Sequence, residues 1–430
     1  RFNGLYITEP MALELIASAV PEHQVDILDL RLDPQPLEDY LDTFRPDVVG
    51  VTGVTALHDQ INNVLAKAKS RGAFTVAGGP HASFAYQDLT NLDAAVIGEG
   101  EDTFRELVFN LENCKDLSLV PNLCWKKGEQ WIRNKRGTLD FYLWPLPRRA
   151  FPRHYKYDAF GTSIALIEAT RGCPHRCTFC LTPQLFLGKY RMRPVRQVVD
   201  YISTRPEKII MFCDPDFLAS PKYAGLLLDE IRASDLKKTY SVALRADEIV
   251  QNRDLIKEWS KAGLAFAFVG FESYNQEQQD SYGKGLSISM NEEAVSILNQ
   301  CNIISLGTLI VDPNWGSAEF DECSKYARRL KSDVIGFSVL TPFPGTPISR
   351  QYKITTDYNK FDLMHAVTET KLPYEEFQGR VRKLQKSQAH RAIGRLLLKL
   401  TRRKLLNWRF LFRLPKLFSF VHLGEEGYQL

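Results

Sequence analysis

The chain has 430 residues, of which 44% are hydrophobic and 25% charged, a composition typical of a globular protein with two or three domains. No apolar run of about 18 residues occurs, which argues against a membrane-spanning helix. The first residues do not follow the basic-then-apolar pattern of a secretion signal, so we expect a cytoplasmic location. The net charge of +4 conceals an asymmetry: residues 380–416 contain thirteen Lys or Arg and no Asp or Glu, so the remainder carries 42 basic and 51 acidic residues.

The first 135 residues predict a doubly wound, Rossmann-like α/β domain, because short apolar runs alternate with amphipathic segments. The expected parallel strands are 24–30, 47–51, 73–77 and 94–97. Small and hydroxylated residues follow them in "VTGVTA", "AGGPHAS" and "GEGE", where glycine permits close approach of a ligand. Ordinary turn chemistry explains the same residues. The G-x-G-x-x-G pattern with a following acidic residue is missing, which disfavours a dinucleotide.

A proline-punctuated aromatic stretch, "DFYLWPLPRR", indicates a linker over residues 136–160. Six further strand candidates then alternate with helical patterns and predict a partial (β/α)6 barrel over residues 161–350, with its chemistry at the carboxyl ends of the strands. The candidates are 163–169, 208–213, 239–244, 265–270, 304–311 and 334–340. Residues 351–430 are expected to form a helical region that ends in a basic amphipathic tail.

Three cysteines in "RGCPHRCTFC", namely Cys173, Cys177 and Cys180, directly follow the first barrel strand. A structural zinc site usually needs four protein ligands, and no second cysteine pair of suitable spacing exists. Three thiolates indicate an iron–sulfur cubane with one iron left open for a ligand. We expect His175, inside this loop, to be a solvent-facing spacer. The five other cysteines lack paired spacing, so we expect them to be reduced, buried thiols.

The Cys-x3-Cys-x2-Cys spacing, with Phe179 before the last cysteine, resembles the radical S-adenosylmethionine (AdoMet) superfamily. The resemblance implies a 4Fe–4S cluster whose open iron binds AdoMet, and reductive cleavage of AdoMet to a 5′-deoxyadenosyl radical. It further implies AdoMet contacts at Phe179, at Asp214 and Asp216 (ammonium), at Arg245 (carboxylate) and at Glu272 (ribose). In "MFCDPDFLA" the family's usual glycine pair is replaced, and helix capping is the alternative role of these aspartates.

The loops of the front domain resemble the cobalamin-binding domain that precedes the barrel in one radical AdoMet subclass. The implied cobalamin contacts are Thr52, Thr55, Leu57, His58, Gly78, Gly79, Pro80, His81, Gly98, Glu99 and Gly100. The D-x-H-x-x-G motif, whose histidine ligates cobalt in other cobalamin proteins, is absent from the sequence. Cobalamin without that histidine ligand is therefore expected.

The segments "EPMALELIASAV" and "KFDLMHAVTETKLPYEEF" resemble the class B methylase subgroup that includes hopanoid C-3 methylase. This resemblance implies methylation of an unactivated sp³ carbon of an apolar, lipid-like small molecule, with an external electron donor such as flavodoxin or ferredoxin. One alternative is a cobalamin-dependent cyclisation or rearrangement, as in tetrapyrrole ring formation, without methyl transfer. A second alternative is a non-catalytic protein that binds cobalamin and the cluster.

The basic tail interleaves Arg and Lys with Leu, Phe and Trp at helical spacing. Such a helix can lie on an anionic bilayer, so we expect peripheral membrane contact in which Leu397, Leu405, Trp408 and Phe412 become buried. The alternative is a helix that packs its apolar face on the barrel. We do not expect a nucleic-acid partner, because no aromatic platform or RNA-binding motif accompanies the charge.

Overall fold

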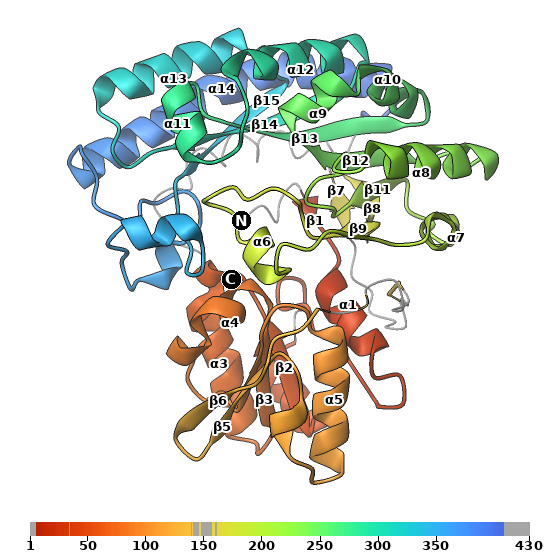
Figure 1. The fold of residues 1–430 in the computed structure, drawn as a ribbon, viewed down its shortest axis with the longest axis vertical. Coiled ribbons are helices and arrows are strands. Elements are labelled where there is room, and N and C mark those ends of the chain that lie inside the picture. Colours follow the sequence, from red (N-terminus) through yellow and green to blue (C-terminus); the bar gives the residue numbers. More distant parts are fainter. Residues whose placement is uncertain are drawn as a thin grey trace.

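The computed structural model describes residues 6–33, 35–138, 140, 146–147, 157–159 and 161–407. Two sheets organise these residues: a five-stranded sheet near the start of the chain and an eight-stranded sheet after it, both packed against helices (Figure 1). The fold is α/β, as predicted. Most of the expected linker over residues 136–160 lies outside the described residues.

The front sheet places three parallel strands beside an antiparallel hairpin. Its order is β2 (Val48–Thr52), β3 (Phe74–Gly78), β4 (Ala94–Val96), β5 (Leu123–Lys127) and β6 (Gln130–Arg133). The helices α3 (His58–Lys69) and α5 (Glu101–Glu112) lie on opposite sides of this sheet (Figure 1). Because β2, β3 and β4 run parallel, the loops that follow them meet at one edge.

The predicted strand over residues 24–30 is wrong, because this segment has no regular structure. Asp26 Oδ1 accepts a hydrogen bond from the backbone N of Ile27 at 2.8 Å, and Asp29 Oδ1 accepts one from the backbone N of Arg31 at 3.1 Å. Aspartate side chains that bind nearby backbone groups compete with a strand ladder. The strand β1 (Tyr6–Ile7) pairs with the larger sheet instead.

All six predicted barrel strands are present and run parallel. They are β8 (Thr162–Ile167), β11 (Ile209–Phe212), β12 (Thr239–Leu244), β13 (Leu264–Glu272), β14 (Ile304–Val311) and β15 (Val334–Val339). The antiparallel β7 (Asp158–Ala159) and β1 extend the β8 edge of the sheet, which remains open. A separate ribbon joins β9 (Thr170–Arg171) to β10 (Arg191–Met192).

The helices of the second domain cover the outer face of its sheet (Figure 1). In chain order they are α7 (Val195–Ser203), α8 (Pro221–Ala233), α9 (Ala246–Gln251), α10 (Arg253–Lys261), α11 (Gln276–Ser281), α12 (Ile288–Gln300), α13 (Ser317–Arg329) and α14 (Tyr374–Arg402). Short helices near the domain boundary are α1 (Met11–Ser18), α2 (Leu37–Phe44), α4 (Gly79–Ala85) and α6 (Thr182–Leu185).

One continuous core fills the space between this sheet and its helices. Trp259 of α10 is fully buried there against Phe212 and Tyr240, and its indole N donates to the carbonyl of Ala224 at 3.2 Å. All eight cysteines are free thiols. Cys124 and Cys323 are buried as predicted, whereas Cys114 is exposed, contrary to the prediction.

The long helix α14 closes the base of the barrel, where the strands begin. Leu396 and Leu400 are buried against the starts of the strands, and Leu397 and Leu405 pack beside them. The predicted membrane role is therefore wrong for Leu397 and Leu405, because their apolar surface already covers the barrel. Trp408 and Phe412 lie outside the described residues.

Within the part of the chain that the structure describes, no helix combines the length and the apolar character needed to cross a bilayer.

Candidate functional site

The loop from Gly172 to Leu181, called the cluster loop below, carries the three cysteines between β9 and α6. Gly172 has φ +86°, and a Cβ there would collide with the carbonyl of Lys189. Burial raises the pKa of Cys173 to about 12 and also raises that of Cys177. These thiols therefore need a bound metal to become thiolates at neutral pH.

The spacing of these thiols suits a cluster better than a single zinc ion. Thiolates on one zinc ion lie about 2.3 Å from it, so their sulfur atoms fall within roughly 4.6 Å of one another. Among the described residues, the three ligand atoms that lie within 4.8 Å of one another belong to His175, Asp216 and Glu248, and not to the cysteines. The three sulfur atoms therefore do not all converge as ligands of a single zinc ion would, and three thiolates with an open fourth position remain the donor set that an iron–sulfur cubane uses.

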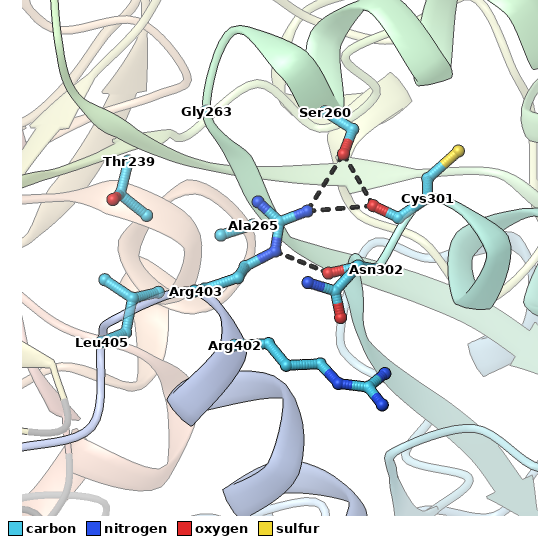
Figure 2. A pocket seen from close by; sticks show the side chains of 9 residues that line it. All are labelled: Thr239, Ser260, Gly263, Ala265, Cys301, Asn302, Arg402, Arg403 and Leu405. Carbon is cyan, nitrogen blue, oxygen red and sulfur yellow. Dashed lines mark hydrogen bonds between the residues drawn. The ribbon is translucent and has the colours of Figure 1, made fainter.

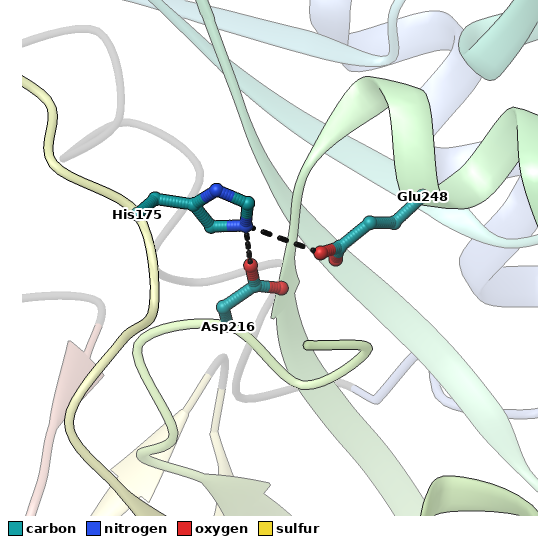
Figure 3. Close-up of side chains that lie close together, drawn as sticks. All are labelled: His175, Asp216 and Glu248. Atoms are coloured by element: carbon teal, nitrogen blue, oxygen red, sulfur yellow. Dashed lines mark hydrogen bonds and ion pairs between the residues drawn. The ribbon is translucent and has the colours of Figure 1, made fainter. Parts of the chain in front are cut away.

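His175 is more than the solvent-facing spacer that the sequence predicts, because its side chain, although 31% exposed, pairs with two carboxyl groups. Its Nε2 lies 3.2 Å from Asp216 Oδ2 and 3.4 Å from Glu248 Oε1, so the cluster loop is tied to the ends of β11 and β12 (Figure 3). The bonds to Asp216 and Glu248 raise the pKa of His175 to about 9.

The two carboxyl groups beside His175 differ in charge. Burial raises the pKa of Glu248 to about 8, whereas bonds from His175 and Glu248 hold the pKa of Asp216 below its usual value despite burial. At neutral pH the group therefore contains one imidazolium, one carboxylate and one carboxylic acid. Apart from the acid proton of Glu248, Asp216 Oδ1 is buried without a hydrogen-bond partner among the described residues, so the Asp216 carboxylate remains available to a cationic ligand.

Asp214 and Arg245 already have partners within the chain. Asp214 Oδ1 accepts a hydrogen bond from the backbone N of Thr170, and burial raises the pKa of Asp214 to about 7. Arg245 follows β12, pairs with Asp247 at 3.2 Å and donates to the carbonyl of Lys284 at 2.6 Å. Asp214 Oδ2 is also buried without a hydrogen-bond partner among the described residues, so both predicted aspartates keep an oxygen that a ligand could use.

Glu272 lies where β13 ends and has φ +58°, a region that non-glycine residues seldom occupy. The ladder between β13 and β14 is irregular there. Glu272 Oε1 accepts a hydrogen bond from Lys284 Nζ at 2.5 Å, and the same ammonium donates to the carbonyl of Gly270 at 2.5 Å. Strained backbone of this kind occurs often at ligand sites.

Phe179, the aromatic residue predicted to contact AdoMet, packs edge-to-face on Tyr282, with ring centres 5.5 Å apart.

The predicted cobalamin residues gather at the shared edge of β2, β3 and β4. Gly79 has φ +84°, and a Cβ there would collide with Thr52 Oγ1, so two of the loops touch. Gly98 has φ +82°, and a Cβ there would lie 2.9 Å from the carbonyl of Leu185 in the barrel domain. Glu99 pairs with Arg171, so its carboxylate faces the barrel domain.

A chain of hydrogen bonds fixes the tautomers of both histidines in these loops. Asn62 Oδ1 accepts from the backbone N of Thr90 at 2.8 Å, so Asn62 Nδ2 donates to His58 Nε2 at 2.9 Å. His58 consequently carries its proton on Nδ1 and donates to His81 Nε2 at 2.9 Å. His81 then keeps its own proton on Nδ1.

Both nitrogen lone pairs are used by this chain, so neither imidazole has one free for cobalt, in line with the missing D-x-H-x-x-G motif. Burial lowers the pKa of His81 to about 4, which keeps the ring neutral. His81 is 1% exposed, and its Nδ1 has no hydrogen-bond partner among the described residues. A buried N–H of this kind at the end of β3 fits a ligand that carries acceptors, such as the amide-rich periphery of a corrin.

The short helix η7 (Tyr358–Lys360) reaches from the second domain onto these loops. The ring of Tyr358 lies 4.8 Å from that of His58 and 5.1 Å from that of His81. Asn359 donates to Asp59 at 2.7 Å. Residues near the "KFDLMHAVTETKLPYEEF" segment thus cover the front domain.

Sequence reasoning missed four residues of this region: Arg171, Glu248, Lys284 and Tyr358. Two of them had a local signal: Glu248 lies three residues after Arg245 in "ADEI", and Lys284 stands between two glycines in "YGKGL". Arg171 and Tyr358 had none that pointed to the domain boundary, because Glu99, Glu101 and Asp88 lie far away in the other domain.

A cavity of about 380 Å³ at the base of the barrel is not part of this site (Figure 2). Arg403 donates there to the carbonyls of Cys301 and Asn302 and to the hydroxyl of Ser260, at 2.6–3.1 Å. Those carbonyls follow the end of α12, where a cation is favoured. Arg403 therefore stabilises a helix end.

Two family models match the chain in succession. The B12 binding domain matches residues 3–108, and the radical SAM superfamily matches residues 167–327. The first model covers the three loops at the edge of the front sheet, and the second covers the cluster loop and the ends of β11, β12 and β13.

Individual relatives cover most of the chain. Hopanoid C-3 methylase of Methylococcus capsulatus is 30% identical over 396 residues, 88% of this chain and 76% of that protein. Anaerobic magnesium-protoporphyrin IX monomethyl ester cyclase of Cereibacter sphaeroides is 24% identical over 378 residues, 81% of this chain and 60% of that protein.

A solved structure shares the fold. The radical S-adenosylmethionine methyltransferase TsrM of Kitasatospora setae, solved with cobalamin and a [4Fe-4S] cluster bound, superposes with a TM-score of 0.71 at 19% identity, covering 80% of this chain and 72% of that one.

Proposed function

The chain belongs to the cobalamin-binding radical SAM methyltransferases, and on that premise we propose that it methylates an unactivated sp³ carbon of an apolar, lipid-like small molecule. Its cofactors are a 4Fe–4S cluster, AdoMet and cobalamin. The observation that carries the proposal is the direct contact between the cluster loop region and the "GEGE" loop, through Arg171 and Glu99. Similarity to hopanoid C-3 methylase supports the class of substrate.

Cys173, Cys177 and Cys180 are proposed to hold the cluster, and the carboxylate of Asp216, beside Glu248, to receive the ammonium of AdoMet. When bound, these cofactors supply a 5′-deoxyadenosyl radical that abstracts hydrogen, and a methyl group carried on cobalt. Arg245 is proposed to orient the AdoMet carboxylate, although it must share its guanidinium with Asp247.

Two further contacts complete the proposal. Glu272, held by Lys284, is proposed to accept hydrogen bonds from the ribose hydroxyls. Gly78, Gly79 and Pro80, together with the loops at Thr52 and Gly98, are proposed to admit the corrin at the edge of the front sheet. Positioning the reacting groups within a shared interface is worth several orders of magnitude in rate.

Two partners predicted from the sequence remain proposals. An external electron donor of the flavodoxin or ferredoxin type is required to reduce the cluster. Peripheral membrane contact is proposed only for residues beyond Asn407, since α14 is committed to the barrel.

A cyclisation or rearrangement without methyl transfer is the second candidate, favoured by similarity to the magnesium-protoporphyrin ester cyclase over 81% of the chain. The two functions differ in product mass, because only a methyltransferase adds carbon to its substrate.

The deciding experiment incubates the reconstituted enzyme anaerobically with deuteromethyl AdoMet, a reductant and a lipid extract, and reads the products by mass spectrometry. We expect a lipid that has gained an intact deuteromethyl group. The matched control is the variant with Cys173, Cys177 and Cys180 all changed to Ala. An unlabelled product that has lost hydrogen would favour the cyclisation instead.

A further inference from the structure

A buried ion-pair network joins the front domain to the start of the cluster loop. Arg171 NH1 lies 3.1 Å from Glu99 Oε1, and Arg171 NH2 lies 2.7 Å from Glu101 Oε1. Glu99 Oε2 lies 2.9 Å from NH1 of Arg191, the residue paired with Arg171 across the β9–β10 ribbon. The Glu99 carboxylate therefore bridges two neighbouring arginines of the barrel domain.

Arg171 is also held from its own side. Glu168, three residues earlier, accepts hydrogen bonds from Arg171 Nε at 2.9 Å and from NH2 at 2.7 Å. Burial alone would lower the pKa of Arg171, but the carboxylates of Glu168 and Glu101 hold it well above its usual value. The guanidinium side chain is 5% exposed, so its charge acts on these carboxylates with little solvent screening.

Short stretches of chain connect this network to both cofactor loops. A single residue, Gly172, separates Arg171 from Cys173, and it lies so close to Lys189 that a Cβ at Gly172 would collide with the Lys189 carbonyl. On the other side, Glu99 stands between Gly98 and Gly100, and Gly98 lies against Arg136 and Leu185. Arg136 NH2 donates to the carbonyl of Leu185 at 3.0 Å and reinforces this contact.

We propose that Arg171 is a positioning residue that sets the distance between the cluster and the corrin through its ion pairs with Glu99 and Glu101. This inference rests on the proposed function, in that the cluster binds at Cys173 and the corrin binds beside Gly98. A displacement of 1 Å between reacting groups costs about 100-fold in rate. A planar, forked guanidinium that engages several carboxylates fixes such a distance better than a lysine would.

Other contacts also hold the two domains together. Asn359 bonds to Asp59 and Tyr358 bonds to Asp88, both across the same boundary and away from the cluster loop. If Arg171 only attached the domains, its loss would lower stability in the way that loss of these contacts does. The test must therefore read the separation of the cofactors.

The experiment uses the holoenzyme loaded with cluster and cobalamin and reduced so that both the cluster and cob(II)alamin are paramagnetic. Pulsed dipolar EPR then gives the distribution of distances between them. The main variant combines Arg171→Gln with Glu101→Gln, which removes one positive and one negative charge together. We expect wild-type iron and cobalamin content, with a distance distribution that is broader or shifted by about 1 Å or more.

Arg171→Lys keeps the positive charge but loses the forked guanidinium. We therefore expect a distance distribution whose width lies between that of wild type and that of the double variant. Asn359→Ala is the matched control and should leave the distribution unchanged. A double variant with the wild-type distribution overturns the inference.

If the double variant fails to take up iron, the distance distribution is measured in Glu101→Gln alone, which removes one of the two interdomain ion pairs of Arg171. A wild-type distribution in that variant then overturns the inference. A wild-type protein that takes up no cobalamin refutes the proposed function instead.

Discussion

The two ends of the barrel both bury charged side chains, but they pair them differently. At the base, Lys399 donates to Asp333 at 2.6 Å, to Asn299 at 2.7 Å and to the carbonyl of Ile303 at 2.6 Å. At the rim, two carboxyl groups, Asp216 and Glu248, share one nitrogen of His175. At the base these bonds tie α14 to the strand starts, whereas at the rim they tie the cluster loop to residues that follow the strand ends. A buried carboxylate oxygen without a partner among the described residues occurs in both regions, at Asp333 Oδ1 and at Asp216 Oδ1.

This difference shows that charge density along the sequence does not locate a binding site. The most basic stretch of the chain contributes Lys399 and Arg403 to structure, and its leucines close the barrel. The rim is inconspicuous by composition, yet it gathers carboxyl groups from three separated segments. What distinguishes the rim among the described residues is that ligand atoms of His175, Asp216 and Glu248, from separate segments, lie within 4.8 Å of one another.

The largest effect is expected at the rim, in the variant with all three cluster cysteines changed to Ala. Because Cys173, Cys177 and Cys180 supply every proposed protein ligand, cluster absorbance and deoxyadenosine formation should both be lost. Thermal unfolding should stay close to that of the wild-type apoprotein. A triple variant that still cleaves AdoMet would contradict the assignment of the cluster site.

The next effect is expected at the base. Lys399→Ala leaves Asp333 buried without its cation, which should lower the free energy of unfolding by about 3–5 kcal/mol, measured by denaturant titration. Leu398→Ala, at an exposed neighbouring position, is the control and should change stability by less than about 0.5 kcal/mol. If Lys399→Ala is as stable as this control, the base is not a structural closure and the contrast with the rim fails.

A paired substitution tests the edge of the front sheet. A Cβ at Gly78 would meet its nearest atom, Val96 Cβ, at 3.8 Å, so Gly78→Ala fits the chain. Loss of cobalamin affinity in this variant, by about tenfold or 1.4 kcal/mol, therefore reports contact with the ligand. Gly79→Ala should lower both affinity and stability, because the new methyl group collides with Thr52. If Gly78→Ala binds cobalamin with wild-type affinity at equilibrium, the proposed contact between the corrin and this loop is wrong.

The smallest effect concerns the histidine tautomers. Asn62→Asp still accepts from Thr90 but now also accepts from His58 Nε2, which should move the proton of His81 from Nδ1 to Nε2. Nitrogen-15 NMR of histidine-labelled apoprotein measures this shift. Asn63→Asp adds the same charge at an exposed neighbouring position and should leave both tautomers unchanged.

The same chain of bonds predicts the spectrum of bound cofactor. Because neither imidazole has a free lone pair, the EPR spectrum of protein-bound cob(II)alamin should show no splitting from a histidine nitrogen. A nitrogen splitting that disappears in His81→Phe would refute the tautomers assigned here.

Much of the architecture follows from the sequence, because it depends on local patterns. Apolar runs of strand length marked β2, β3, β4 and all six barrel strands, and the spacing of Cys173, Cys177 and Cys180 indicated the cluster. The segment 24–30 failed for a local reason as well: its aspartates bind the adjacent backbone, and an apolar pattern does not reveal this.

Only the tertiary structure decided which side chains meet across long separations. His175 looked like a spacer because Asp216 and Glu248 are 41 and 73 residues away, and Arg171 looked unremarkable because Glu99 and Glu101 belong to the other domain. The fate of Leu397 and Leu405 was likewise undetermined, since an apolar helix face packs equally well on a bilayer or on strand ends. The hydrophobic effect is non-directional, so it favours burial of an apolar helix face without specifying against what. The tertiary fold determines which surface buries it.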